Sequence, residues 1–482
     1  MTGQPTPADI AWNILAAAAE QYQDSPRATN WLSACIARLS EPIRIAVAGP
    51  AGAGKSAVVN SLAGELIAPI EVGAGTGVCA WYQAGAEPAA AVCPPGGPPR
   101  PVPVARRDRR LHIDLRHWEA GQVARVLVDW PARGLRDLVL IDAPASVDTD
   151  WLAGQCDAVV YATPEPTEAD LDLLRSTMDA GWPAAQVTTI MALSRADELG
   201  AGRIDALTSA KQIARRRRTD PAVHAVCHNV IAVAGLLAAT GRTLREDEFA
   251  ALGTLARTPK AELDVVLLSA DRFISADELR VPMSRPARVE LLDRFGVFGI
   301  RLASTLIRRG ANTHATLAAQ LVQRSGINEL RESIGRYFLA RADVLRARSA
   351  LLGLGMVLRA EPRPPAAALA AEAEQAMIST HDFAELRLLS SLQCGRLTLP
   401  GGLADSAERL VGGHGVGIAE RLGLETEASE PELRQAVFDR LGQWRAQSES
   451  PLLSTRQRAA ARTVVRSCEG LLADLAPAPA YH

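Results

Sequence analysis

The eight residues from Gly49 to Ser56 read GPAGAGKS and match the pattern G-x-x-x-x-G-K-[ST]. Loops of this kind bind the phosphates of nucleoside triphosphates. Their glycines let successive backbone N–H groups point inward, and the dipole of the following helix adds to the anion site. We therefore expect Lys55 to reach the β- and γ-phosphates and the Ser56 hydroxyl to bind Mg²⁺.

The sequence on either side of this loop has the order that such a site requires. The apolar run 43–48 indicates a buried strand before the loop, and residues 57–62, beginning at Ala57, are compatible with a helix after it. A glycine-rich turn before a surface helix is the alternative interpretation. The order of strand, glycine loop and helix favours the phosphate site.

A second apolar run, 138–142, ends in Asp142-Ala-Pro-Ala145. In GTPases an aspartate at this place holds Mg²⁺ through a water molecule, and the N–H of the fourth residue senses the γ-phosphate. An aspartate at the end of a strand is common, so this motif alone is weak. We interpret Asp142 as a metal-binding residue and Ala145 as a γ-phosphate contact.

A third apolar run, 191–193, continues into Ser194-Arg195-Ala196-Asp197, which resembles the base-recognition motif Asn/Thr-Lys-x-Asp. Asp197 would accept hydrogen bonds from N1 and N2 of guanine, and adenine offers no matching pair of donors. The planar guanidinium of Arg195 could lie along the base. This motif therefore predicts GTP as the nucleotide.

A fourth apolar run, 231–233, leads into the small residues Ala234 and Gly235. The backbone N–H of either residue could meet O6 of guanine. The order of the four motifs, each at the end of an apolar strand, favours one ligand crevice at the carboxyl ends of parallel strands.

One threonine stands out between the glycine loop and Asp142. Thr76, in Gly73-Ala74-Gly75-Thr76-Gly77, is the only residue with an aliphatic hydroxyl between Ser61 and Ser146. GTPases use such a threonine to bind Mg²⁺ and the γ-phosphate, and flanking glycines suit a loop that orders around the triphosphate. A threonine in a hairpin turn is the alternative.

These motifs define the predicted site. Lys55 and Thr76 are the candidate catalytic residues, and Ser56, Thr76 and Asp142 are the candidate Mg²⁺ ligands. The residues assigned to the nucleotide are Gly49, Gly52, Ala53, Gly54, Lys55, Ser56, Ala57, Asp142, Ala145, Ser194, Arg195, Asp197, Ala234 and Gly235.

Composition limits the remaining possibilities. Apolar residues make up 48% of the 482 residues and charged residues 22%, which is typical of a folded soluble protein. A net charge of −2 argues against a nucleic-acid partner. The seven cysteines are scattered and never in C-x-x-C spacing, so they predict buried thiols in a reducing cytosol. No window is apolar enough to cross a bilayer.

The chain is long enough for two or three domains. Short apolar runs alternate with helical patterns over residues 42–241 and predict an α/β P-loop GTPase domain, a mostly parallel sheet with helices on both faces. Residues 1–41 predict helices that pack with the trunk, and residues 242–482 predict a large all-α helical bundle. The strands are expected at 43–48, 78–83, 123–129, 138–142, 158–162, 187–193 and 229–234, and one long helix is expected at 327–358.

With these motifs in this order, the chain resembles bacterial dynamin-like GTPases, and more narrowly the mycobacterial isoniazid-inducible dynamin-like proteins. The likeness extends over nearly the whole chain, and its most specific segments are 194–206, 269–273 and 294–301. Residues 325–331, SGINELR, look like a trunk element of bacterial dynamin-like proteins. The resemblance implies GTP hydrolysis, pairing with a second copy or a paralogous dynamin-like protein, and a cytoplasmic location at the inner face of the plasma membrane.

The chain also departs from the dynamin pattern. Ala51 and Gly52 stand where dynamins carry polar residues that position the attacking water and a monovalent cation, Ala145 replaces a glycine, and Arg195 replaces a lysine. Phosphoryl transfer depends on positioned charge and water, so we expect nucleotide binding to persist and hydrolysis to be slow.

Two alternatives remain open. The chain could be a structural partner that binds GTP or GDP, barely hydrolyses GTP, and serves a catalytic sister protein. It could also be an unrelated P-loop ATPase with a helical lid, in which case ATP would compete effectively with GTP.

Overall fold

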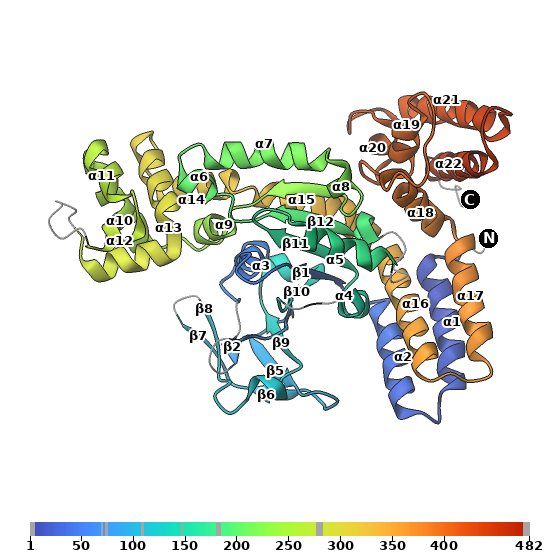
Figure 1. The fold of residues 1–482 in the computed structure, drawn as a ribbon, viewed down its shortest axis with the longest axis horizontal. Helices are drawn as coiled ribbons and strands as arrows, with labels where there is room; N and C mark the ends of the chain where they lie inside the picture. Colours follow the sequence, from blue (N-terminus) through green and yellow to red (C-terminus); the bar gives the residue numbers. More distant parts are fainter. Residues whose placement is uncertain are drawn as a thin grey trace, which may run out of the picture.

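The computed structural model describes residues 5–68, 71–72, 76–107, 110–145, 147, 149–179, 185–275 and 283–475. At its centre lies a nine-stranded sheet, seen in the middle of Figure 1, with the strand order β13-β12-β11-β1-β10-β4-β9-β5-β6. The strands are β1 (Ile43–Ala48), β4 (Ala80–Ala84), β5 (Ala89–Cys93), β6 (Arg100–Val102), β9 (Arg125–Trp130), β10 (Leu138–Asp142), β11 (Ala158–Thr163), β12 (Thr189–Leu193) and β13 (Asn229–Ala232).

The sheet is mostly parallel, which confirms the predicted fold class. Parallel pairing joins β13, β12, β11, β1 and β10 in turn, and also joins β4 to β9. The pairs β10–β4, β9–β5 and β5–β6 are antiparallel. Two small hairpins stand apart: β2 (Glu71–Val72) with β3 (Thr76–Gly77), and β7 (Val104–Arg107) with β8 (Arg110–Ile113).

Helices cover both faces of the sheet, as predicted. Residues of α3 (Lys55–Ala63) and α15 (Ile327–Tyr337) share one hydrophobic cluster with Ile45 and Val47 of β1. Ala46 and Ala48 of the same strand face the other cluster. The helices of the sheet region that contribute to that second cluster include α4 (Thr149–Gln155), α5 (Glu168–Asp179) and α7 (Ala206–Arg218).

Every regular element described after residue 241 is helical, but the helices do not form one bundle. They divide among three hydrophobic clusters, and Figure 1 shows them as separate groups around the sheet. The first group is α10 (Glu246–Arg257), α11 (Lys260–Val266), α12 (Ala270–Ser275), α13 (Arg285–Arg308) and α14 (His314–Arg324). The last group is α18 (His381–Gln393), α19 (Leu403–Leu410), α20 (Ile418–Leu422), α21 (Glu430–Glu449) and α22 (Thr455–Asp474).

The two N-terminal helices belong to the group between these. Helices α1 (Pro7–Gln21) and α2 (Pro26–Arg38) pack with α16 (Ala342–Ala360) and α17 (Ala366–Ser379) around a cluster that includes Leu15, Leu32 and Leu354. The remaining short elements are α6 (Leu199–Gly202), α8 (Pro221–His224), α9 (Gly235–Arg242), η1 (Ala120–Gln122), η2 (Arg133–Leu135), η3 (Ala185–Thr188) and η4 (Leu339–Arg341). Within the described ranges, every helix is too short or too polar to cross a bilayer.

The single helix predicted for 327–358 is wrong, because the chain turns between α15 and α16. The turn η4 contains Arg341, whose buried guanidinium donates hydrogen bonds to the backbone oxygens of Val411 (3.0 Å) and Gly412 (2.6 Å). Phe338, just before the turn, is fully buried. Apolar periodicity predicts both helices, but the break depends on partners far along the chain.

The segment 325–331 is also placed differently from the expectation. It lies between α14 and α15, and Ile327 and Leu330 join the hydrophobic cluster of the sheet. The segment therefore packs on the α/β core and not within a separate trunk.

A buried ion pair fastens the N-terminal helices to the sheet. Arg38 of α2 lies 2.8 Å from Asp157, which precedes β11, and the two side chains are 5% and 0% exposed. The other Asp157 carboxylate oxygen accepts the Arg44 N–H at 2.8 Å. Loss of one member leaves the other charge buried without compensation.

We therefore expect Asp157→Ala to lower the free energy of unfolding by about 3–5 kcal/mol. Asp172→Ala, at the exposed pair with Arg175, is the matched control and should cost less than about 1 kcal/mol. Urea denaturation followed by circular dichroism measures both. Equal losses for the two variants would contradict this role of the buried pair.

Candidate nucleotide-binding site

The glycine loop joins β1 to α3 and is held against the end of β11. Gly49 has a φ of 142°, and a Cβ atom there would lie 2.0 Å from the backbone oxygen of Ala162. Only glycine allows so close an approach. Gly52 and Gly54 also have positive φ, at 73° and 82°. The loop therefore has the backbone that its sequence predicts.

Lys55, the first residue of α3, folds back over the loop. Its ammonium donates to the backbone oxygens of Gly49 at 3.0 Å and Pro50 at 3.1 Å. Burial lowers the pKa of Lys55, and the nearby Asp142 carboxylate opposes that shift. A phosphate chain in the loop would offer this ammonium stronger, anionic acceptors than the carbonyls.

The predicted Mg²⁺ ligands Ser56 and Asp142 lie together. The Ser56 hydroxyl donates to a carboxylate oxygen of Asp142 at 2.8 Å. Burial raises the pKa of Asp142 to about 6, while the Ser56 hydrogen bond and the Lys55 charge lower it. A hydroxyl beside a carboxylate is an oxygen donor set that suits Mg²⁺. These residues therefore fit the metal, which would offset the cost of burying the carboxylate.

Two predicted phosphate contacts, Thr76 and Ala145, lie next to residues that the structure does not describe. Thr76 pairs through its backbone with Val72 in the β2–β3 hairpin, but its side chain is outside the described part. Ala145 is exposed and immediately precedes residue 146, which is also outside it. The roles of Thr76 in metal binding and of Ala145 at the γ-phosphate stay predictions.

The base motif and the glycine loop meet through Arg195. Its Cγ atom lies 3.7 Å from the position that a Cβ atom on Gly54 would occupy. Arg195 has a φ of 53°, the only positive value of a non-glycine residue within the described ranges. Its Nε atom lies 3.0 Å from a carboxylate oxygen of Glu198. The aliphatic part of Arg195 thus lies beside the loop, where it could line a ribose and base.

Asp197 follows on the same turn after β12 and is only 7% exposed. Its pKa is raised to about 6: burial raises it most, the Glu198 charge also raises it, and the Arg195 charge lowers it. Ser194 is buried as well, and its N–H donates to the Thr163 oxygen at the end of β11 at 3.0 Å. Ser194 therefore anchors the turn that presents Asp197.

One of the two predicted O6 donors is already engaged. The N–H of Ala234 donates to the backbone oxygen of Ser325 at 2.9 Å, so Ala234 is not available in this structure. Gly235 is the first residue of α9, and the first N–H groups of a helix have no carbonyl partner within it. A Cβ atom on Gly235 would lie 3.0 Å from the backbone carbon of Ala57. Ala234 and Gly235 form the loop after β13 that would meet the base, and we call it the base loop. Gly235 thus places the base loop directly against the start of α3.

Sequence reasoning missed Ser325 as a residue next to this site. The resemblance assigned the segment SGINELR, which begins at Ser325, to the trunk. Nothing in its local pattern indicates a contact with the end of β13.

Comparison with known proteins adds an independent finding. No family model matches the chain. The isoniazid-induced protein IniC of Mycobacterium tuberculosis, from the strains CDC 1551 / Oshkosh and ATCC 25618 / H37Rv, is 36% identical to it over 453 residues. The match covers 91% of this chain and 91% of each relative.

Among solved structures, two chains of an oligomerised bacterial dynamin pair that provides a mechanism for long-range sensing and tethering of membranes align with 97% of this chain and with 74% and 75% of theirs. Their identities are 12% and 11%, and both TM-scores are 0.29, too low to carry a structural argument. The sequence identity over nine-tenths of both proteins is decisive. It confirms the predicted resemblance: the chain belongs to the IniC family.

Proposed function

We propose that this chain is a dynamin-like GTPase that binds GTP with Mg²⁺ and slowly hydrolyses it to GDP and phosphate. One observation carries the proposal: the phosphate motif and the guanine motif, from distant parts of the sequence, meet where Arg195 lies beside Gly54. The phosphates would occupy the glycine loop, and the base would lie toward Asp197. A single nucleotide would therefore contact both motifs, one through its phosphates and the other through its base.

Each residue has a chemical role in this proposal. The N–H groups at the start of α3 and the Lys55 ammonium bind the phosphate oxygens. Ser56 and Asp142 hold Mg²⁺, directly or through water, and the metal neutralises charge that develops on the phosphates. Ionised Asp197 accepts two hydrogen bonds from guanine, and the Gly235 N–H donates to O6.

The slow rate follows from what the loop lacks. Ala51 and Gly52 are exposed and carry no polar side chain that could position water. Among the residues that the structure describes, a Cβ atom on Gly52 would meet nothing within 4 Å, so none of them fills this place. This feature also supports the second candidate, a GTP- or GDP-binding partner of a sister dynamin-like protein that barely hydrolyses GTP.

We further propose that the bound nucleotide controls association with a second copy or with a paralogous dynamin-like protein at the inner face of the cytoplasmic membrane. The resemblance to dynamin-like proteins supports this role. Contacts between the base loop and the helical region offer a physical route for the coupling.

The base assignment predicts a change of specificity on Asp197→Asn. An asparagine presents an amide donor where the aspartate presents only acceptors, so it should disfavour the 2-amino group of guanine and suit the 2-oxo group of xanthine. We expect GTP affinity to fall about a hundredfold and xanthosine triphosphate affinity to rise, measured by calorimetry.

Competition between GTP and ATP for binding to the wild-type protein is the control for this experiment. Preference for ATP, or selectivity that Asp197→Asn leaves unchanged, would refute the base assignment.

The two raised carboxyl pKa values predict a pH dependence of binding. Asp142 and Asp197 both have pKa values near 6, and both must be ionised to bind Mg²⁺ and guanine. Affinity for Mg·GTP should therefore be constant well above pH 6 and fall as pH decreases through it. Each carboxylate contributes about a tenfold loss per pH unit below its pKa.

The Asp197→Asn variant lacks one of these ionisations, so the pH profile of its residual affinity for GTP should be shallower. Identical profiles for wild type and variant would show that Asp197 does not titrate in this range.

Phosphate release separates the two candidate functions. A GTPase with a slow intrinsic rate should release phosphate from GTP alone, and faster with liposomes or with the sister protein. Lys55→Ala is the inactive control, because it removes the ammonium from the phosphates. Release no faster than that of Lys55→Ala under all three conditions would favour the non-hydrolysing partner.

A further inference from the structure

The connection between α14 and α15 contacts the base loop directly. Ser325 is 1% exposed, and its backbone oxygen accepts the N–H of Ala234 at 2.9 Å. Ala234 immediately precedes Gly235, the residue assigned to O6 of guanine. The helical part of the chain therefore supplies a hydrogen-bond partner to the loop that would read the base.

Gly326 brings the two backbones even closer. It has a φ of 81°, and a Cβ atom there would lie 2.0 Å from the backbone oxygen of Ala232 and 3.6 Å from the Cα atom of Val233. A side chain of any size would push the segment away from the end of β13. Glycine is thus required by space and by backbone conformation together.

The orientation of this contact is fixed by local and distant bonds. The Ser325 hydroxyl donates to the Val322 oxygen at 2.7 Å and accepts the Ile327 N–H at 3.3 Å. Further along α15, Ser333 accepts a hydrogen bond from the Asn229 amide of β13 at 2.9 Å. These bonds hold the segment in register with β13 on both sides of Gly326.

The same helix also reaches the phosphate side of the site. Arg331 donates to the backbone oxygens of Ser61, at 3.1 Å, and Leu62, in the last turn of α3. The start of α3 carries Lys55 and Ser56. Segment 325–331 therefore contacts both the helix that follows the phosphate loop and the loop that would meet the base.

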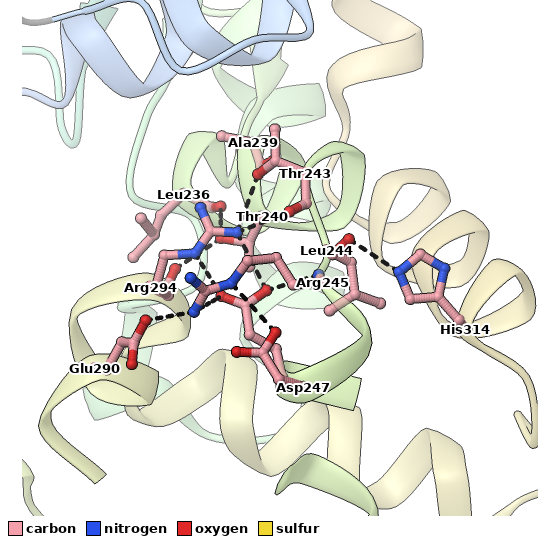
Figure 2. Close-up of polar contacts among 11 residues, drawn as sticks. Leu236, Ala239, Thr240, Thr243, Leu244, Arg245, Asp247, Glu290, Arg294 and His314 are labelled. Atoms are coloured by element: carbon pink, nitrogen blue, oxygen red, sulfur yellow. Dashed lines mark hydrogen bonds and ion pairs between the residues drawn. The ribbon is translucent and has the colours of Figure 1, made fainter. Parts of the chain in front are cut away.

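Helix α9 packs closely against neighbouring elements at both ends: at its start, a Cβ atom on Gly235 would lie 3.0 Å from the backbone carbon of Ala57. Near its C-terminal end, a Cβ atom on Gly241 would lie 3.0 Å from Leu321 of α14. Figure 2 shows the network there: Thr240 donates to the Arg294 backbone oxygen at 2.7 Å, and the Arg294 guanidinium donates to the Thr243 backbone oxygen at 3.0 Å. Arg294 Nε also donates to buried Glu248 at 2.7 Å. The base loop is thus held between α9 and the segment that contains Ser325.

We propose that Ser325 and Gly326 are positioning residues for guanine recognition, an inference that rests on the proposed GTP site. The Ser325 backbone oxygen engages the Ala234 N–H and so leaves the Gly235 N–H as the donor to O6. The close approach of Gly326 to β13 sets the place of that donor relative to Asp197. Movement of α14 or α15 would then change affinity for the base. Affinity for the phosphates would depend on the glycine loop.

Three ligands test this inference on the full chain. GTP reports the whole site, and inosine triphosphate keeps O6 and N1–H but lacks the 2-amino group bound by Asp197. Inorganic triphosphate reports the glycine loop alone. For Gly326→Ala we expect affinity for both purine nucleotides to fall together by about tenfold or more, with inorganic triphosphate changed less than about twofold.

Gly335→Ala is the matched control. It lies in the same helix α15, and its added Cβ atom would meet no described residue within 4 Å, so all three affinities should equal those of the wild type. A milder variant, Ser325→Ala, removes only the hydroxyl and should weaken both purine nucleotides about two- to fivefold. It keeps the inference testable should Gly326→Ala not fold.

The outcomes are distinct. Purine affinities unchanged in the folded variants, or losses equal for all three ligands, would overturn the positioning role while the GTP site stands. A wild-type chain that does not prefer GTP to ATP would refute the proposed function before any variant is compared.

Discussion

The site depends on two backbone contacts that only glycine permits. The carbonyl oxygens of Ala162, in β11, and Ala232, at the end of β13, each point at a glycine, Gly49 and Gly326, where a Cβ atom would lie 2.0 Å away. The first contact seats the phosphate loop on the sheet. The second seats a helical connection beside the base loop. Because parallel strands end at one edge, both contacts bring their segments to the same crevice.

Burial of charge is the second constraint on this crevice. Asp142 and Asp197 are both almost inaccessible, and burial raises the pKa of each to about 6. Their ionised forms are unfavourable without compensation, which a divalent cation and the donor edge of guanine would each supply. The fold therefore holds these carboxylates in a state that favours binding such ligands.

The sequence predicted seven of the nine strands of the sheet and the order of its motifs, because local apolar runs determine them; β5 and β6 were not predicted. Apolar runs ending in Asp142 and Asp197 are visible in the printed chain, and their strands pair as expected. The break before α16 was not predictable, because it depends on Arg341 reaching distant carbonyls. The engagement of Ala234 was missed for the same reason: its partner Ser325 belongs to a helical region whose packing no local pattern reveals.

The packing of this helical region crosses the predicted boundary between the GTPase domain and the helical bundle. Helix α15 lies beyond residue 241, the predicted end of the GTPase domain, yet Ile327, Leu330 and Ile334 share a hydrophobic cluster with Ile231 and Val233 near the base loop. A GTPase domain that ended at residue 241 would expose Ile231 and Val233. It would also lack the Ser325 carbonyl that accepts the Ala234 N–H. The helical region is thus part of the physical structure of the proposed nucleotide crevice, and a change in its packing would have a short path to a base bound there.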